Sequence, residues 1–358
     1  MSKNHKTKVI PFDQVIAALL DNSKPFSPTH LHRFSDLTVE NLNDLKTAWS
    51  KIEKERKASL MKDLEDLNNH DTLVCFDGIS QMAIDDPDPR VRACSITLLW
   101  ECDDDRLAPK FIEIMQHDPD EVVRATAAST LGMFVYLGEL EEIPGKLLKK
   151  IETVLLEIIN NPAESNLVRR RVFEALGYSS REEVPALIEK AYHMEDEQWQ
   201  ASALFAMGRS VDNRWEKYIL ESLDSQDEIQ FEAVRAAGEL ELESARERLL
   251  EMLKNEDEEL DDDLRDAAIW SLTKIGGEDV RDVIEKMIDE TDDEEELEFL
   301  QNALDNLEFT EGAELFGMVD LEANTEKEGL DFVLDLDAKD EDEDDDPDSL
   351  LGPGPSNN

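Results

Sequence analysis

The chain of 358 residues carries 37 Lys and Arg residues against 87 Asp and Glu residues, which gives a formal net charge of −50. Proteins that bind nucleic acid or an anionic membrane need clustered positive charge, so this balance excludes both kinds of partner. The hydrophobic fraction of 40% is ordinary and is sufficient for a folded core.

Residues 1–37 form an N-terminal segment that we expect to be partly ordered. Its short apolar stretch, Val15–Leu20, is preceded by Asp13 and Gln14 and is followed by no small-residue cleavage site, so it is not typical of a signal peptide. No run of apolar residues in the chain is long enough to span a bilayer. The three cysteines are an odd number without metal-like spacing, which favours a reduced, cytoplasmic compartment.

Weak helical pairs begin near Thr38, and an internal repeat follows them. Its clearest copy is DPDEVVRATAASTLG, residues 118–132. Asp118 is the expected N-cap and Pro119 the first helical residue, and Gly132 stands where a C-terminal glycine would close the helix. The apolar residues of this copy recur at four-residue steps, as on one face of a helix: Val123, Ala127 and Leu131.

Equivalents of Val123 recur along the chain at spacings of 32, 45, 31, 30 and 35 residues: Val91, Val168, Trp199, Ile229 and Leu264. A second amphipathic helix lies between successive copies, and neither helix is long enough to bury its apolar face alone. The sequence therefore predicts an all-α fold, an α-solenoid of antiparallel helix pairs over residues 38–310, with a helical cap (38–70) and repeats (71–310).

The D-P-x-x-x-V-R-x-x-A-x-x-x-L-G pattern of residues 118–132 resembles HEAT repeats, and most closely the short, phycobilisome-lyase-like variety. Residues 86–100, 161–177 and 183–208 match it in most positions. The resemblance implies an interaction scaffold. It also implies that the arginine after each anchor, as at Arg92, Arg124, Arg169 and Arg265, pairs with acidic groups of a neighbouring repeat in an internal ladder.

The densest basic cluster of the repeats is Arg169–Arg171. Three consecutive helical residues point in different directions, so at most two share a surface. With Arg169 in the ladder, Arg170 is a candidate contact for an acidic partner group, and a merely solvated side chain is the alternative.

The 45-residue spacing contains about 14 residues more than its neighbours, and the surplus falls within residues 133–150. Its apolar residues predict either a lengthened helix pair that packs on the next repeat or an insertion that shapes a binding surface. The candidate partner-binding residues of this segment are Phe134 and Tyr136.

Residues 311–358 are predicted to be an acidic, disordered tail, because residues 311–348 alone have a net charge of −15. Within it, an acidic and apolar stretch, GLDFVLDLD, begins at Gly329. It could fold onto a partner or dock on the solenoid, and its candidate contact residues are Leu330, Phe332 and Leu334.

No pattern in the sequence indicates catalysis. The chain lacks the His-Glu pairs of the di-iron hydroxylases that resemble HEAT proteins, a phosphate-binding glycine loop and a calcium-loop spacing. We therefore expect no enzyme, no cofactor and no metal, but a scaffold or adaptor whose acidic surface binds basic protein partners. The alternative is a phycobilisome-lyase-like accessory enzyme that acts on a tetrapyrrole. The oligomeric state stays open.

Overall fold

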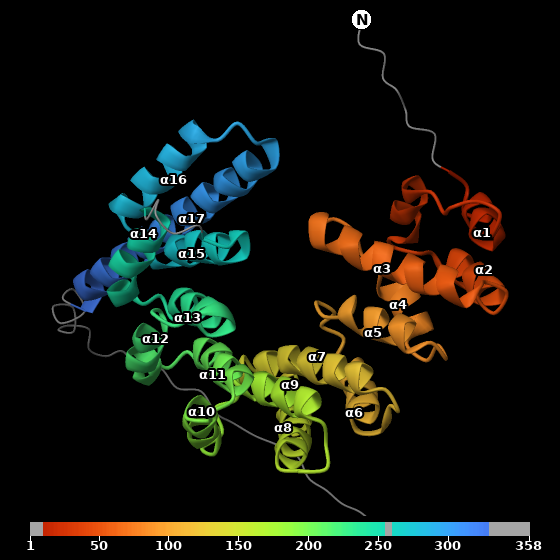
Figure 1. Ribbon diagram of the computed structural model, residues 1–358, viewed down its shortest axis with the longest axis horizontal. Helices are drawn as coiled ribbons and strands as arrows, with labels where there is room; N and C mark the ends of the chain where they lie inside the picture. The colour runs from red at the N-terminus through yellow and green to blue at the C-terminus, as the bar shows by residue number, and fades with distance from the viewer. Residues whose placement is uncertain (1–9, 255–259, 329–358) are drawn as a thin grey trace, which may run out of the picture. The chain divides into compact units, whose positions relative to one another are not determined.

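The computed structural model describes residues 10–254 and 260–328 (Figure 1). The chain divides into two units, residues 1–307 and residues 308–358. Throughout the described residues the secondary structure is helical, which confirms the predicted all-α class.

The N-terminal helices form a hydrophobic core that they share with the first helices of the repeats. The N-terminal helices are α1 (Phe12–Leu20), η1 (Pro28–Phe34), α2 (Val39–Trp49) and α3 (Lys54–His70). Phe12, Val15 and Leu19 of α1 are buried in this core. The predicted N-terminal segment is thus folded from residue 10 onward, because α1 has a continuous apolar face that α2 and η1 cover.

Two layers of helices make up the repeats. In the first, which we call the close-packed layer, each helix packs along the next one (Figure 1). Its members are α5 (Pro89–Thr97), α7 (Glu121–Glu139), α9 (Asn166–Leu176), α11 (Glu197–Arg209), α13 (Asp227–Glu239) and α15 (Asp262–Ile275).

The second layer consists of helices that pack mainly on their partners in the close-packed layer. They are α4 (Asp77–Ala83), α6 (Ala108–His117), α8 (Gly145–Ile159), α10 (Val184–Tyr192), α12 (Glu216–Ser222), α14 (Arg246–Lys254) and α16 (Glu278–Glu290), with the short helices η2 (Asp105–Leu107), η3 (Asn213–Trp215) and η4 (Glu243–Ala245) before α6, α12 and α14. These pairs follow the predicted repeat and form the expected solenoid.

Glycines permit the tight spacing of the close-packed layer. A Cβ added to Gly177 would lie 2.9 Å from the Cα of Ala206, and one added to Gly208 would lie 3.0 Å from the Cα of Ala236. On Gly238 it would lie 2.7 Å from the Cα of Ser271. Such approaches are closer than carbon atoms tolerate, so these positions require glycine for packing.

Gly177 directly follows the last residue of α9, as the repeat pattern predicts for a closing glycine. The corresponding glycines of α7, α11 and α13 lie within their helices instead, contrary to the prediction. Gly132 lies well inside α7, and the backbone leaves the helix through a left-handed residue further on. In α7, α11 and α13 a left-handed residue stands three positions beyond the last glycine of the helix. The pairs are Gly138 and Glu141 (φ 61°), Gly208 and Val211 (φ 50°), and Gly238 and Glu241 (φ 49°). Only α15 places a glycine there, Gly276 (φ 75°).

The N-cap of α7 is Asp120 rather than the predicted Asp118. The Asp120 carboxylate accepts hydrogen bonds from the backbone nitrogens of Val122 and Val123, whereas Asp118 is engaged with the backbone nitrogen of Asp120 and with Arg92. The helix thus begins two residues later than its sequence pattern indicates.

The last described helix is α17 (Glu294–Glu328). Leu300, Ala303 and Leu307 of α17 are buried in the core of the first unit. The tail predicted to be disordered from residue 311 therefore begins as helix, which continues to Glu328.

Candidate protein-binding surfaces

The arginine ladder links neighbouring repeats. Arg92 pairs with Asp118 at 2.7 Å, Arg124 with Glu164 at 2.7 Å and Arg265 with Glu296 at 2.6 Å. Arg92 and Arg124 also donate to main-chain carbonyls six residues earlier, at Asp86 and Asp118: the two N–H···O distances are both 2.9 Å. These three arginines are structural, as the resemblance implied.

Arg169 departs from the ladder. Its Nε donates to the carbonyl oxygen of Ile159 at 3.0 Å, and its guanidinium lies 5.6 Å from the Trp199 ring centroid. It thus links the end of α8 to α11, but without a carboxylate.

Arg170 is a core residue and offers no docking point, because its side chain is only 8% exposed. Its Nε donates to Ser202 Oγ at 2.9 Å, and that hydroxyl donates to Glu174 at 2.7 Å. Arg171 closes the network with an ion pair to Glu174 at 2.6 Å. The arginine cluster is therefore occupied within the fold.

The surplus of residues 133–150 lengthens α7 and α8, as the packing alternative required. Phe134 is fully buried and lies 5.9 Å from Phe111, ring to ring, so it cannot meet a partner. Tyr136 points the other way: it is 40% exposed, and its ring lies 5.2 Å from that of Tyr178. The tail candidates Leu330, Phe332 and Leu334 lie outside the described residues.

Tyr136 marks the beginning of a surface that the sequence analysis missed. Aromatic and cationic side chains of successive close-packed helices gather there, and we call this surface the aromatic–arginine strip. It consists of Tyr136, Tyr178, Phe205, Arg209, Phe231, Arg235, Trp270 and Lys274.

Arg209 is central to the strip. Its guanidinium carbon lies 3.9 Å from the Phe205 ring centroid, 4.6 Å from that of Tyr178 and 5.9 Å from that of Trp100. Among the described residues, no carboxylate, hydroxyl or carbonyl oxygen hydrogen-bonds to it. Burial lowers the pKa of Arg209 from its usual value, yet arginine stays charged at any physiological pH.

The other cations of the strip are neutralised by local acids. Arg235 pairs with Glu232 at 3.3 Å, and Lys274 pairs with Glu239 at 2.8 Å. Burial raises the pKa of Glu232, and Arg235 opposes that rise. Among the cations of the strip, Arg209 alone makes no ion pair within 4 Å in the described part of the chain, although Glu174 and Glu239 interact with it electrostatically. Asp263 and Asp266 add negative charge at a pocket of about 520 Å³ in this strip.

Two pockets hollow this strip. One of about 220 Å³ lies between Tyr178, Phe205 and Arg209, and one of about 520 Å³ lies between Phe231, Trp270 and Lys274. Arg235 and Glu239 line both pockets, so the two are adjacent.

A regular signal for the strip exists in the sequence. An aromatic residue is followed four positions later by a cation in three successive close-packed helices: Phe205 and Arg209, Phe231 and Arg235, Trp270 and Lys274. Residues four apart share a helix face, and the guanidinium carbons of Arg209 and Arg235 lie 3.9 and 5.7 Å from the ring centroids of Phe205 and Phe231. Phe205 and Trp270 stand six residues after their repeat anchors, whereas Phe231 stands two residues after its own, so the pairs do not all recur in one register.

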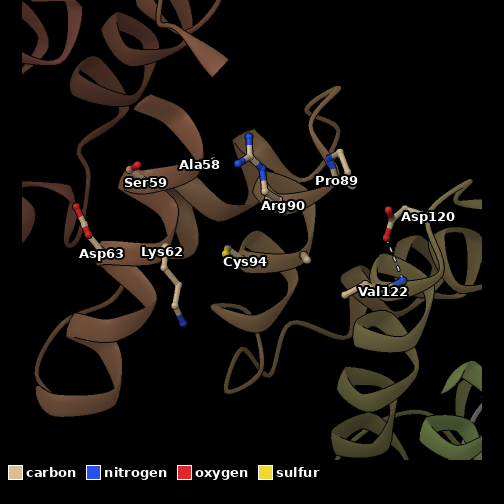
Figure 2. A pocket seen from close by; sticks show the side chains of 10 residues that line it. Ala58, Ser59, Lys62, Asp63, Pro89, Arg90, Cys94, Asp120 and Val122 are labelled. Carbon is tan, nitrogen blue, oxygen red and sulfur yellow. Dashed lines mark hydrogen bonds between the residues drawn. The ribbon is translucent and has the colours of Figure 1, made fainter. Parts of the chain in front are cut away.

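A larger pocket of about 580 Å³ lies between α3, α5 and the start of α7 (Figure 2). Its cations are already paired, Lys62 with Glu65 at 3.1 Å and Arg90 with Asp88 at 2.8 Å. Burial raises the pKa of Cys94 in this pocket to about 12, which keeps the thiol protonated and a poor nucleophile.

Exposed acids gather where α11, α13, α15 and α17 begin. We call these residues the acidic edge: Glu195–Glu197, Asp227–Glu228, Asp261–Asp263 and Asp292–Glu295. Asp196, Asp261 and Asp293 cap their helices, and negative charge at a helix N-terminus is stabilising. In the described part of the chain, Glu228 is the single member of this edge with a cationic partner, Arg170 at 3.6 Å.

Residues 10–254 and 260–328 contain neither a metal-ion site nor a membrane-spanning helix. No three His, Cys, Asp or Glu side chains there are arranged as a metal-ion site. None of the helices in these ranges has both the length and the apolar character needed to cross a bilayer.

Comparison with known proteins identifies the repeats. Residues 76–151 and 216–304 match the family model of HEAT repeats, and both stretches are helix pairs of the two layers described above. The chain therefore contains HEAT repeats within an α-solenoid fold. This match does not show the finer resemblance to the phycobilisome-lyase-like variety of HEAT repeats. No curated protein matches the chain.

Solved structures with similar helical arrays share little sequence with this chain. YibA of Escherichia coli is 17% identical, with a TM-score of 0.38 over 80% of this chain and 98% of YibA. A Kap95p structure described with RanGDP is 11% identical, with a TM-score of 0.36 over 83% of this chain and 45% of that one. A structure of a Kap95:Nup1 complex is 13% identical, with a TM-score of 0.35 over 83% and 41% of the two chains. This chain thus spans less than half of the Kap95 chains.

Proposed function

We propose that this HEAT-repeat protein is a non-enzymatic scaffold whose acidic edge binds partner proteins with a basic face. The observation that carries the proposal is the disposition of charge. The arginines of the ladder form ion pairs between repeats. The carboxylates of the acidic edge, by contrast, are exposed, and in the described residues almost none of them has a cationic partner.

Such an edge favours basic partners for an electrostatic reason. Four clusters of like charge lie on helix starts of neighbouring repeats, and their fields add along the edge. A complementary basic surface would relieve this repulsion, accelerate encounter and set the register of the complex. We therefore expect the purified protein to be uncoloured, with no tetrapyrrole band in its absorbance spectrum.

The test is affinity purification with quantitative mass spectrometry, at about 0.1 M and about 1 M salt, where the screening length falls from about 10 to about 3 Å. The bait is compared with a variant that neutralises six acids of the edge and leaves the capping residues intact. Its substitutions are Glu195→Gln, Glu197→Gln, Asp262→Asn, Asp263→Asn, Glu294→Gln and Glu295→Gln.

A control variant removes six exposed acids elsewhere, so that net charge is matched. Its substitutions are Glu142→Gln, Glu157→Gln, Glu182→Gln, Glu243→Gln, Glu247→Gln and Asp282→Asn. We expect basic partners that are released by high salt and lost from the edge variant but kept by the control. Partners that bind all three proteins equally, or that lack a basic face, would contradict the proposal. So would a coloured complex with a titratable tetrapyrrole.

A further inference from the structure

We infer that the aromatic–arginine strip is a second binding surface, one that takes an extended peptide of a partner protein carrying a single carboxylate beside apolar side chains. This surface adjoins the acidic edge, because Asp263 of the edge also lines the pocket of about 520 Å³, but its Arg209 end prefers an anion rather than a cation.

Arg209 is held ready for an anion. Its guanidinium lies against Phe205 and Tyr178, which remove it from water while contributing no hydrogen-bond acceptor in their ring planes. Within the described chain its N–H groups have no acceptor, although they border a pocket of about 220 Å³. A partner carboxylate could accept two parallel N–H bonds from this planar group.

The charge balance limits the ligand to one negative charge near Arg209. Arg235 and Lys274 are matched by Glu232 and Glu239, so a polyanion would meet unfavourable carboxylates on either side. The net charge of −50 repels nucleic acid in addition. A carboxylate from a peptide satisfies Arg209 without introducing such surplus charge.

The rings supply the apolar part of the site. Phe205 and Phe231 are half-buried, and Trp270 is 40% exposed and lines the pocket of about 520 Å³. Large rings that are already fixed in a fold offer contact area at small entropic cost, as in other protein interfaces.

The geometry of the close-packed layer favours an extended peptide. Packed helices lie about 8–10 Å apart, and an extended chain advances about 3.3 Å per residue. One step between helices therefore corresponds to about three residues of peptide. Apolar side chains three positions apart would meet the successive pockets, with the acidic residue at the Arg209 end.

The test uses two synthetic heptapeptides, blocked at both ends and labelled for fluorescence anisotropy. Each has apolar side chains at its first and fourth positions and serines between them. One ends in aspartate and the other in asparagine. The full-length protein is expected to bind the aspartate peptide about tenfold or more tightly than the asparagine peptide, since charge-assisted hydrogen bonds favour the carboxylate.

Arg209→Gln is expected to abolish that preference, and Arg209→Lys to retain part of it. Lys217→Gln is the matched control, because it removes one exposed cation from α12, away from the strip. Trp270→Ala is a second variant that should weaken both peptides equally and leave their ratio unchanged. Thermal unfolding of each variant verifies the fold.

Equal binding of the two peptides, absence of binding by both, or a preference that survives Arg209→Gln would overturn the inference. Stronger binding of single-stranded nucleic acid at the same surface would do so as well. Capture of basic partners by the acidic edge is expected to be unaffected by Arg209→Gln, so failure of one proposal is distinguishable from failure of the other.

Discussion

The contact between Gly238 and Ser271 allows a direct test of how the close-packed layer is held together. In Gly238→Ala, the new Cβ would lie 2.7 Å from the Cα and Cβ of Ser271 and 2.6 Å from its Oγ. Carbon atoms pack at about 3.5–4.0 Å, so α13 and α15 must separate by about 1 Å. The separation also strains the 2.9 Å hydrogen bond from Ser271 Oγ to the Val234 carbonyl oxygen.

The magnitude follows from opposing contributions. Overpacking costs about 1–3 kcal/mol and the strained hydrogen bond about 0.5–1.5 kcal/mol, whereas replacing a helical glycine by alanine returns about 0.5–1 kcal/mol. We expect a net loss of about 1–3 kcal/mol in the free energy of unfolding. Urea denaturation followed by circular dichroism measures this loss, and hydrogen exchange should show faster exchange of the amides in α13 and α15.

Gly145→Ala is the matched control. A Cβ on Gly145, at the start of α8, would meet no atom within 4 Å. This variant is expected to be as stable as the wild type or about 0.5–1 kcal/mol more stable. If Gly238→Ala unfolded at the same urea concentration as the wild type, with unchanged exchange in α13 and α15, close backbone approach would not be what requires glycine there.

Three further predictions concern strain, a buried ion pair and pH. Val211 is 85% exposed with φ 50°, so Val211→Asn should stabilise the fold by about 0.5–1 kcal/mol and raise Tm; an unchanged Tm would show that this turn is unstrained. Lys57 pairs with the buried Asp86 at 2.8 Å, so Lys57→Met should cost about 3–5 kcal/mol in chemical denaturation at pH 7, and a cost below about 1 kcal/mol would contradict a dry environment. Burial raises the pKa of Glu152 above its usual value of 4.5. Between that value and the raised pKa, the folded state holds a proton that the unfolded chain has released, so ionisation of Glu152 at higher pH, including pH 7, destabilises the fold. Glu152→Gln should therefore be more stable than the wild type at pH 7, and the difference in Tm should narrow as the pH falls toward 4.5; a constant difference would refute this.

Local patterns in the sequence were sufficient for the helix pairs. The four-residue recurrence of Val123, Ala127 and Leu131 predicts a buried face because it depends only on helix geometry. All three are fully buried. The arginine ladder was likewise predictable, since Arg92 and Arg124 occupy equivalent places in repeats with acidic neighbours.

Tertiary contacts decided the features that the sequence did not reveal. Phe134 and Tyr136 are two residues apart and both aromatic, yet the first is in the core and the second at the surface, because α7 continues past Gly132 and turns them to different sides. The role of Gly132 was misjudged for a related reason. A glycine near a helix end resembles a stop signal, whereas its actual requirement comes from α9: a Cβ on Gly132 would lie 3.2 Å from the Cα of Ala175.

The sequence contains the aromatic and cationic pairs of the strip, but only the stacked helices bring these pairs together on one surface. Arg209 reaches rings from three parts of the chain, Trp100, Tyr178 and Phe205, which are far apart in sequence. Single-sequence periodicity reports which face of one helix is apolar, but it carries no information on which faces of different helices adjoin.

The glycine contacts also define how the repeats can flex. In the close-packed layer, backbone lies against backbone at Gly177, Gly208 and Gly238, so this layer resists further compression. Helices of the second layer meet chiefly their own partners and can spread or approach one another more freely. Bending would therefore leave the close-packed layer as a neutral axis of nearly constant length. Binding surfaces on this layer would keep their spacing from repeat to repeat, while the helices of the second layer move apart or together.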